Sequence, residues 1–191
     1  MNEINTDSLW LIGERDKSGK HSNFYHGNFI PQISNQLIRR YTKENETVLD
    51  LFMGSGTTLF ECETLNRKFI GFDINTEIIK YVEQKMEESD KNRFKINNCD
   101  VSNFDLFNRT IQKSIFELRC EKIQFIIVHP PYMDIIKFTD KKEDLSQISD
   151  IKTFISKFVD VLRNALPYLE IKKYFSIVIG DVYKNSEVVC K

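Results

Sequence analysis

The sequence predicts an α/β protein in which parallel strands, flanked by helices, form one sheet. From residue 32 onward, short apolar runs alternate with helical patterns of apolar side chains. This alternation is typical of βαβ units with right-handed crossovers. The 191 residues, 41% of them hydrophobic, are enough to bury the core of a single domain. We expect neither secretion nor a membrane span, because no basic leader precedes an apolar run and no apolar stretch approaches 18 residues.

The first elements surround a glycine turn. Residues 1–30 are polar and irregular, and residues 32–42 follow a proline with apolar side chains at helical spacing. Residues 47–52 form a short apolar run, typical of a buried strand, that leads into Gly54-Ser55-Gly56. Residues 57–65 then continue as a helix, so the turn joins a strand to a helix.

The remaining elements continue the alternation. We expect further strands at 68–74, 93–99, 124–129 and 174–182, and helices at 75–88, within 103–120 and at 151–169. The sheet therefore has five strands. Residues 133–149 are rich in charge and poor in large apolar groups, which predicts a mobile loop after the fourth strand.

Composition limits the classes of partner and cofactor. The chain has 27 basic and 28 acidic residues, so no overall positive field indicates a nucleic-acid partner, although a local basic patch is still possible. The four cysteines lack metal-ligand spacing and lie in or beside apolar runs, at Cys62, Cys99, Cys120 and Cys190. We expect no metal, buried thiols and a reducing, cytoplasmic location.

The glycine turn predicts a cradle for a small ligand. Glycines let a ligand approach the backbone, and the free N–H groups of the following helix point toward the same place. Asp73 ends the next strand, where a carboxylate can accept hydrogen bonds from ribose hydroxyls. Leu59 stands where a dinucleotide fingerprint requires glycine, so we expect an adenosine-like ligand without pyrophosphate, such as S-adenosylmethionine. Alternatively, the glycines only shape the turn and Asp73 caps the next helix.

The loop after the most apolar strand predicts a clamp for a planar base. Pro130 and Pro131 fix the backbone direction, so their carbonyls and the His129 side chain can accept hydrogen bonds from an amino group. Tyr132 can stack on the ring that carries this group. A neutral His129 can accept, so activity should rise with pH through about 6.5. Alternatively, the two prolines only end the strand.

At these two places the sequence resembles the S-adenosylmethionine-dependent DNA amino-methyltransferases, which make N4-methylcytosine or N6-methyladenine. Residues 49–58 resemble their cofactor motif, and His129-Pro130-Pro131-Tyr132 resembles their catalytic motif. Residues 26–31 resemble the segment that covers the methionine end of the cofactor, and the whole resemblance spans residues 20–183. It implies a Rossmann-like methyltransferase sheet, with Asp73 at the ribose and Asp100 near the adenine amino group.

The resemblance also implies the full set of site residues. The cofactor-binding residues would be Phe29, Pro31, Asp50, Phe52, Gly54, Ser55, Gly56, Thr57, Asp73, Ile74 and Asp100. The catalytic residues would be His129, Pro130, Pro131 and Tyr132.

The sequence departs from the family pattern in three ways. His129 replaces the usual Asp, Asn or Ser, and this could instead mark a degenerate copy that does not catalyse. Leu51 replaces a common proline. The family sheet has seven strands, the last two antiparallel, whereas residues 1–191 read as one catalytic domain that lacks the last two strands and shows no target-recognition domain. We therefore expect a partner chain or a further C-terminal part to complete the sheet.

The leading functional prediction is methyl transfer to N4 of cytosine or N6 of adenine in DNA, as in restriction-modification systems. The alternatives are methylation of RNA or of a protein glutamine amide, and a binding subunit without catalysis. We expect Lys137, Lys141 and Lys142 to face the acidic polymer, unless they belong to an ordinary solvated loop.

Overall fold

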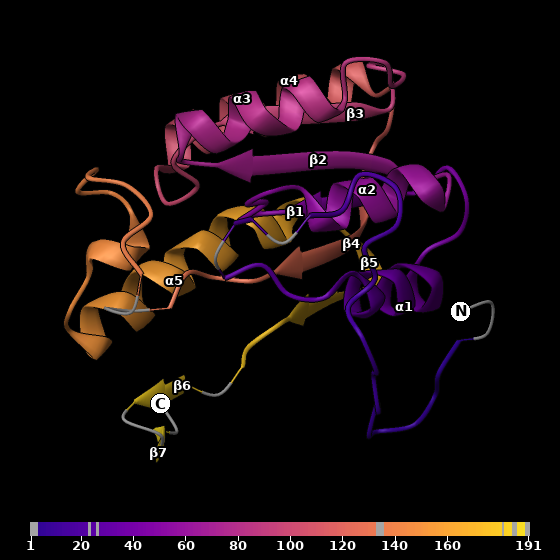
Figure 1. Cartoon of the computed structure of the whole chain (residues 1–191). Helices are drawn as coiled ribbons and strands as arrows, with labels where there is room; N and C mark the ends of the chain where they lie inside the picture. Colours follow the sequence, from indigo (N-terminus) through magenta and orange to yellow (C-terminus); the bar gives the residue numbers. More distant parts are fainter. Residues whose placement is uncertain are drawn as a thin grey trace.

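The computed structural model describes residues 4–22, 24–25, 27–132, 136–180, 182–184 and 187–189, the last two ranges by backbone alone. Five parallel strands form one sheet in the order β3-β2-β1-β4-β5 (Figure 1). The strands are β1 (Thr47–Asp50), β2 (Lys68–Asp73), β3 (Phe94–Asn98), β4 (Ile123–Val128) and β5 (Leu169–Ile177). The predicted class, the five parallel strands and the alternation with helices are confirmed.

Helices cover both faces of this sheet. They are α1 (Pro31–Tyr41), α2 (Thr57–Thr64), α3 (Thr76–Lys85), α4 (Phe104–Glu117) and α5 (Ile151–Ala165). On one face, Val48 of β1 belongs to a buried cluster with residues of α1, α2 and α3. On the other face, Leu49 belongs to a second cluster with residues of α4 and α5. Successive residues of β1 therefore face opposite sides, and both sides are buried, which explains the uninterrupted apolar run.

The C-terminal elements differ from the sequence prediction. Helix α5 ends at Ala165 instead of continuing to residue 169, because Pro167 cannot continue it and a short 3-10 turn, η2 (Leu166–Tyr168), follows. Strand β5 begins at Leu169 and ends at Ile177, whereas residues 174–182 had been predicted. Its first half is irregular around Lys172, which has a positive φ of 67°.

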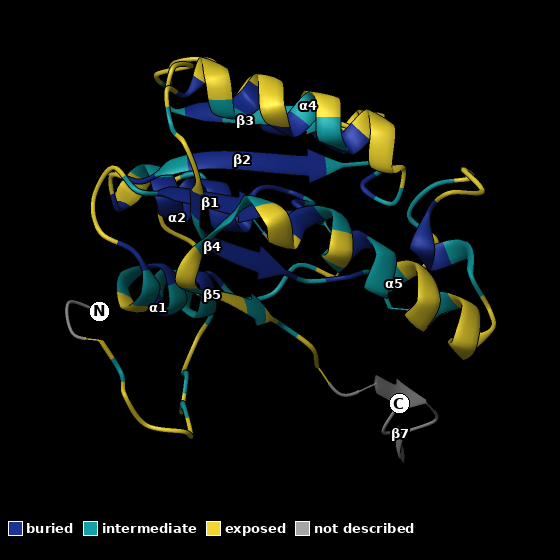
Figure 2. Ribbon diagram, turned by 180° about the vertical axis from the view of Figure 1, so that it is seen from behind, coloured by how far each residue is buried: buried dark blue, intermediate teal, exposed yellow. Residues whose placement is uncertain are grey.

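Two short strands were not predicted. Strands β6 (Val182–Lys184) and β7 (Glu187–Val189) form an antiparallel pair, and this pair is a separate sheet. Among the described residues, the only strand with which β5 pairs is β4. Strand β5 carries several exposed apolar side chains, such as Ile171, of which 87% is exposed. The β5 ribbon is accordingly coloured in part as exposed in Figure 2.

Cys62 and Cys99 are buried free thiols, as predicted, and Cys120 is half-buried. Cys190 lies outside the described residues. No helix in the described part of the chain has both the length and the apolar character that crossing a bilayer requires.

Candidate functional site

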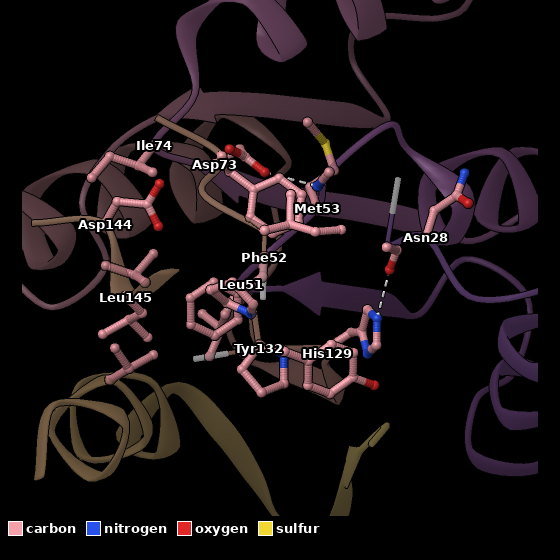
Figure 3. Close-up of a pocket in the computed structure, with 18 of the residues that line it drawn as sticks. Asn28, Leu51, Phe52, Met53, Asp73, Ile74, His129, Tyr132, Asp144 and Leu145 are labelled. Carbon is pink, nitrogen blue, oxygen red and sulfur yellow. Dashed lines mark hydrogen bonds between the residues drawn. The ribbon is translucent and has the colours of Figure 1, made fainter. Parts of the chain in front are cut away.

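One pocket opens at the carboxyl ends of β1, β2, β3 and β4, where the predicted site residues converge (Figure 3). The carboxyl ends of parallel strands lie at the same edge of the sheet, so residues far apart in sequence meet there. The predicted residues that line this pocket are Phe29, Phe52, Gly54, Thr57, Asp73, Ile74, Asp100, His129, Pro130, Pro131 and Tyr132. The predicted residues outside the lining are Pro31, Asp50, Ser55 and Gly56.

The two glycines of the turn have different surroundings. Both have positive φ angles, 52° at Gly54 and 89° at Gly56, which favour glycine. A Cβ at Gly56 would lie 3.0 Å from the Phe60 ring, so this glycine permits close packing where α2 begins. Gly54 lines the pocket, and a Cβ there would lie 3.3 Å from the Tyr25 ring. Gly56 therefore shapes the turn, whereas Gly54 also leaves its backbone open to a ligand.

Asp73 is held at the pocket wall by two backbone donors. Its Oδ2 accepts a hydrogen bond from Gly54 N at 2.8 Å, and its Oδ1 accepts one from Asn75 N at 2.8 Å. The side chain that caps α3 is Asn75, which accepts from Glu77 N and Ile78 N. Burial raises the pKa of Asp73 to about 6, against the lowering effect of the two N–H donors. The carboxylate is thus preorganised, with further lone pairs available to a ligand.

Asp50 and Asp100 differ in their access to the pocket. Asp50 is buried behind the turn, where its Oδ1 accepts from Phe52 N at 3.1 Å. Burial raises the pKa of Asp50 to about 6. Asp100 lines the pocket, and its Oδ1 accepts from the backbone and the hydroxyl of Ser102 at 2.8 and 2.7 Å. Asp100 can meet a ligand directly, whereas Asp50 fixes the turn.

The N-terminal segment is fastened across the glycine turn. The Lys20 ammonium lies 2.6 Å from the Glu63 carboxylate of α2. His21 Nε2 lies 2.6 Å from a Glu61 oxygen in a buried contact with the same helix. The chain that follows these contacts lines the pocket with Tyr25, Gly27, Asn28 and Phe29. His26 of the predicted covering segment lies outside the described residues.

Ser55 and Pro31 act on this segment rather than on the pocket lining. The Asn28 side chain donates to Ser55 Oγ at 3.1 Å, so Ser55 holds the segment to the turn. Pro31 is the first residue of α1 and is buried. Asn28 lines the pocket itself and was missed by the sequence analysis (Figure 3).

The His129 side chain lies beside Tyr132, as predicted, but its ring nitrogens are not free. Nδ1 lies 2.8 Å from Val178 O, and Nε2 lies 2.8 Å from Gly27 O. Neither nitrogen can therefore accept a hydrogen bond from a substrate in this arrangement, contrary to the expected geometry. The Phe29 ring packs edge-on against the imidazole, with centroids 5.2 Å apart.

Tyr132 is anchored by its hydroxyl. Gly180 N donates to Tyr132 Oη at 2.7 Å, and the Tyr132 ring is perpendicular to the His129 ring. His129 and Tyr132 are thus both tied to the chain that follows β5. The stacking of Tyr132 on a base stays a prediction.

The loop after Tyr132 forms a second wall that the sequence analysis did not assign to the pocket. Phe138 stacks on Tyr25, with ring centroids 5.5 Å apart. Asp144 and Leu145 are buried and face the pocket from the side opposite Asn28 (Figure 3). The sequence signal for this wall is the set of apolar residues within a charged stretch, Ile136, Phe138 and Leu145, all of which line the pocket. The predicted mobility of residues 133–149 stays a prediction, and residues 133–135 lie outside the described residues.

The three lysines of this loop do not behave alike. Lys141 Nζ donates to Ile74 O at 2.6 Å and so fastens the loop to the end of β2. Lys137 and Lys142 are exposed, and their contact with an acidic polymer stays a prediction. No group of three or more His, Cys, Asp or Glu side chains in the described part of the chain is arranged to hold a metal.

This sheet order, with a glycine turn after β1 and acidic residues at the ends of β2 and β3, defines the Rossmann-like methyltransferase fold. A solved structure with this fold is TrmN from Thermus thermophilus, with a TM-score of 0.56 and 18% identity. The similarity covers 80% of this chain and 39% of TrmN. At this identity the similarity concerns the fold alone.

Residues 2–84 match the model of the DNA methylase family. The chain is 33% identical over 88 residues to the Type II methyltransferase M.MjaII of Methanocaldococcus jannaschii. This alignment covers 44% of this chain and 16% of M.MjaII. The chain is also 38% identical over 93 residues to the Type II methyltransferase M.BamHI of Bacillus amyloliquefaciens, and this alignment covers 47% of this chain and 21% of M.BamHI. The chain thus matches a minor part of these relatives. The family match includes the covering segment, the glycine turn and Asp73, but not residues 129–132.

Proposed function

We propose that this chain binds S-adenosylmethionine and transfers its methyl group to the exocyclic amino nitrogen of cytosine or adenine in DNA. One observation carries the proposal: the glycine turn and Asp73 line the same pocket as the Pro130-Pro131-Tyr132 loop. A ligand cradled by the turn would therefore lie beside a loop suited to a planar base. DNA is the proposed substrate because residues 2–84 match the model of the DNA methylase family.

The residues have distinct roles in this proposal. When bound, S-adenosylmethionine would supply an electrophilic methyl group on its sulfonium. Asp73 would accept hydrogen bonds from the ribose hydroxyls, and the N–H groups at the start of α2 would face the methionine carboxylate. Asp100 would accept from the adenine amino group.

The loop would act on the other substrate. Tyr132 would stack on the target base, and the Pro130 carbonyl would accept a hydrogen bond from its amino group. Methyl transfer would form a carbon–nitrogen bond as the carbon–sulfur bond breaks, S-adenosylhomocysteine would be the leaving group, and the proton lost by the nitrogen would pass to solvent. Among the described residues at this loop, the carbonyl is the better acceptor, because both His129 nitrogens lie 2.8 Å from other carbonyls.

Transfer of tritiated methyl groups tests the proposal. The chain should label duplex DNA but neither RNA nor protein, and digestion to nucleosides should yield N4-methylcytosine or N6-methyladenine. Tyr132→Ala should lower the transfer rate at least tenfold while leaving S-adenosylhomocysteine affinity within about twofold. If RNA or protein were labelled and DNA were not, DNA would not be the substrate and this part of the proposal would be wrong.

The second candidate is a binding subunit that does not catalyse. The engagement of both His129 nitrogens favours it, because the usual side-chain acceptor of the loop is then absent. Under this candidate, calorimetry would detect S-adenosylhomocysteine binding, whereas no polymer would be labelled. His129→Asn, which restores an acceptor of the usual type, would then create activity.

A further inference from the structure

His129 joins three segments that are distant in sequence. Its Nδ1 lies 2.8 Å from Val178 O, just after β5, and its Nε2 lies 2.8 Å from Gly27 O, in the covering segment. The residue itself follows β4, at the start of the Pro130-Pro131 loop. A single ring thus bridges the roof of the pocket, the catalytic loop and the chain beyond β5.

Both partners of the ring are hydrogen-bond acceptors. A backbone carbonyl cannot donate, so each short contact requires a proton on the facing ring nitrogen. A neutral imidazole has an N–H on one nitrogen only, so the lone pair of its unprotonated nitrogen would point at a carbonyl oxygen, which is repulsive. Only the imidazolium, with an N–H on both nitrogens, satisfies both contacts.

The surroundings of the ring are compatible with a positive charge. From β1, the Asp50 carboxyl interacts with His129: burial raises the pKa of Asp50 to about 6, and the His129 charge opposes that rise. Tyr132 from the catalytic loop and Phe29 from the covering segment face the ring with their edges. Asp50 and Tyr132 are thus titratable groups beside His129 among the described residues. His26 and Asp181, which adjoin Gly27 and Gly180 in the sequence, lie outside the described residues.

We propose that His129 is a positioning residue that works as an imidazolium and latches the covering segment over the cofactor pocket. The proton on Nε2 holds Gly27. This contact is exposed whereas the Nδ1 contact with Val178 is part-buried, so loss of one proton from the ring releases Gly27. Asn28 and Phe29 line the pocket beside Gly27, so release loosens the roof of the site. The expected effect on cofactor affinity rests on the proposed function, because it requires that S-adenosylmethionine bind in this pocket. The expected protonation of both ring nitrogens rests only on their contacts.

The sign of the effect follows from the proton count. The latched state binds one more proton than the released state, so it is favoured at low pH and weakens as pH rises. Asp73 acts in the opposite direction, because its carboxylate forms as pH rises through about 6. The ratio of wild-type to His129→Gln affinity removes the contribution of Asp73, since both proteins retain it.

The first test is the nitrogen NMR spectrum of the histidine rings in the chain without ligand. The chain has three histidines, so the spectrum contains the signals of three rings. The spectrum of His129→Gln identifies the His129 signals by their loss, and that of His21→Gln identifies the His21 signals in the same way. At pH 6, both His129 nitrogens should show the shifts of protonated ring nitrogens. A neutral ring with one unprotonated nitrogen at pH 6 would overturn the latch, whatever the chain binds.

The second test is calorimetry with S-adenosylhomocysteine between pH 6 and 8.5. Wild type should bind about fivefold more tightly than His129→Gln at pH 6, the value of one typical hydrogen bond, and equally at pH 8.5. The matched control, Glu83→Gln, is an exposed change on α3, and the ratio of its affinity to that of wild type should be independent of pH. A pH-independent ratio for His129→Gln would refute the latch, whereas no binding by wild type at any pH would refute the proposed cofactor.

Discussion

Asp50 and Asp73 end the neighbouring strands β1 and β2, and burial raises the pKa of each to about 6. They differ in access to the pocket, since Asp73 lines it and Asp50 lies behind the turn. A carboxylate that faces the pocket can exchange hydrogen bonds with a ligand. A carboxyl group behind the turn affects mainly the folded state. The two residues therefore give different predictions.

Replacing Asp73 with Asn should weaken S-adenosylhomocysteine binding by about 1–3 kcal/mol, because ribose hydroxyls lose a charged acceptor. Wild-type affinity should also rise between pH 5 and 7 as the carboxylate forms, and the variant should lack this rise. Calorimetry measures both effects. Glu83→Gln, an exposed change on α3, is the control, and equal affinity of Asp73→Asn and wild type would contradict the assignment.

Replacing Asp50 with Asn should flatten the dependence of stability on pH. Because burial raises the folded-state pKa of Asp50, its contribution to stability is complete below about pH 4 and is lost as pH rises through about 6. The loss is on the order of 2–3 kcal/mol. Denaturant unfolding at several pH values measures it. An unchanged slope in the variant would mean that Asp50 has an ordinary pKa in the folded chain.

At the scale of elements, two covering segments meet above the pocket. Tyr25 of the N-terminal segment stacks on Phe138 of the loop after β4. Asn75 Nδ2 donates to Phe138 O at 3.2 Å, and Lys141 fastens the same loop to Ile74. The pocket is therefore closed by contacts between loops, which must part when a ligand leaves.

Phe138→Ala should remove this closure and speed the dissociation of S-adenosylhomocysteine several-fold, with little change in the association rate. Stopped-flow fluorescence or surface plasmon resonance gives both rates. Phe116→Ala, on a side chain of α4 that is 83% exposed, is the matched control. An unchanged dissociation rate for Phe138→Ala would show that the aromatic contact does not limit release.

The unpaired edge of β5 predicts self-association. Edge strands with exposed apolar residues favour pairing with other chains, and Lys172 and Lys173 are the only charges within the central part of β5, residues 171–175. Ile171→Lys should lower concentration-dependent association in sedimentation experiments. Leu11→Lys changes a residue of similar exposure, 86% against 87%, away from the sheet and should have no such effect. Equal association of both variants and wild type would contradict a role for the edge.

At the scale of the whole molecule, local sequence patterns predicted the sheet and the pocket. The alternation of apolar runs placed β1 to β4 within a few residues. The strand ends then brought Gly54, Asp73 and Tyr132 to one edge. The strands and helices could be predicted because each forms from residues that are neighbours in the sequence. The position of the site could be predicted because the carboxyl ends of parallel strands lie at the same edge of the sheet.

The contacts that depend on distant residues could not be predicted. Val178 O and Gly27 O lie 49 and 102 residues from His129, and no periodicity links them to it. The same is true of the Tyr25–Phe138 stack. The bounds of β5 were missed for a local reason, since Leu169–Lys173 is interrupted by two lysines and by the positive φ of Lys172.

The central claim is that the glycine turn and the Pro130-Pro131 loop serve one pocket for S-adenosylmethionine. The structure of the chain crystallised with S-adenosylhomocysteine tests it most directly. The ribose hydroxyls should lie within hydrogen-bond distance of the Asp73 carboxylate, with the sulfur pointing toward Tyr132. A ligand bound elsewhere, or a ribose turned away from Asp73, would contradict the account.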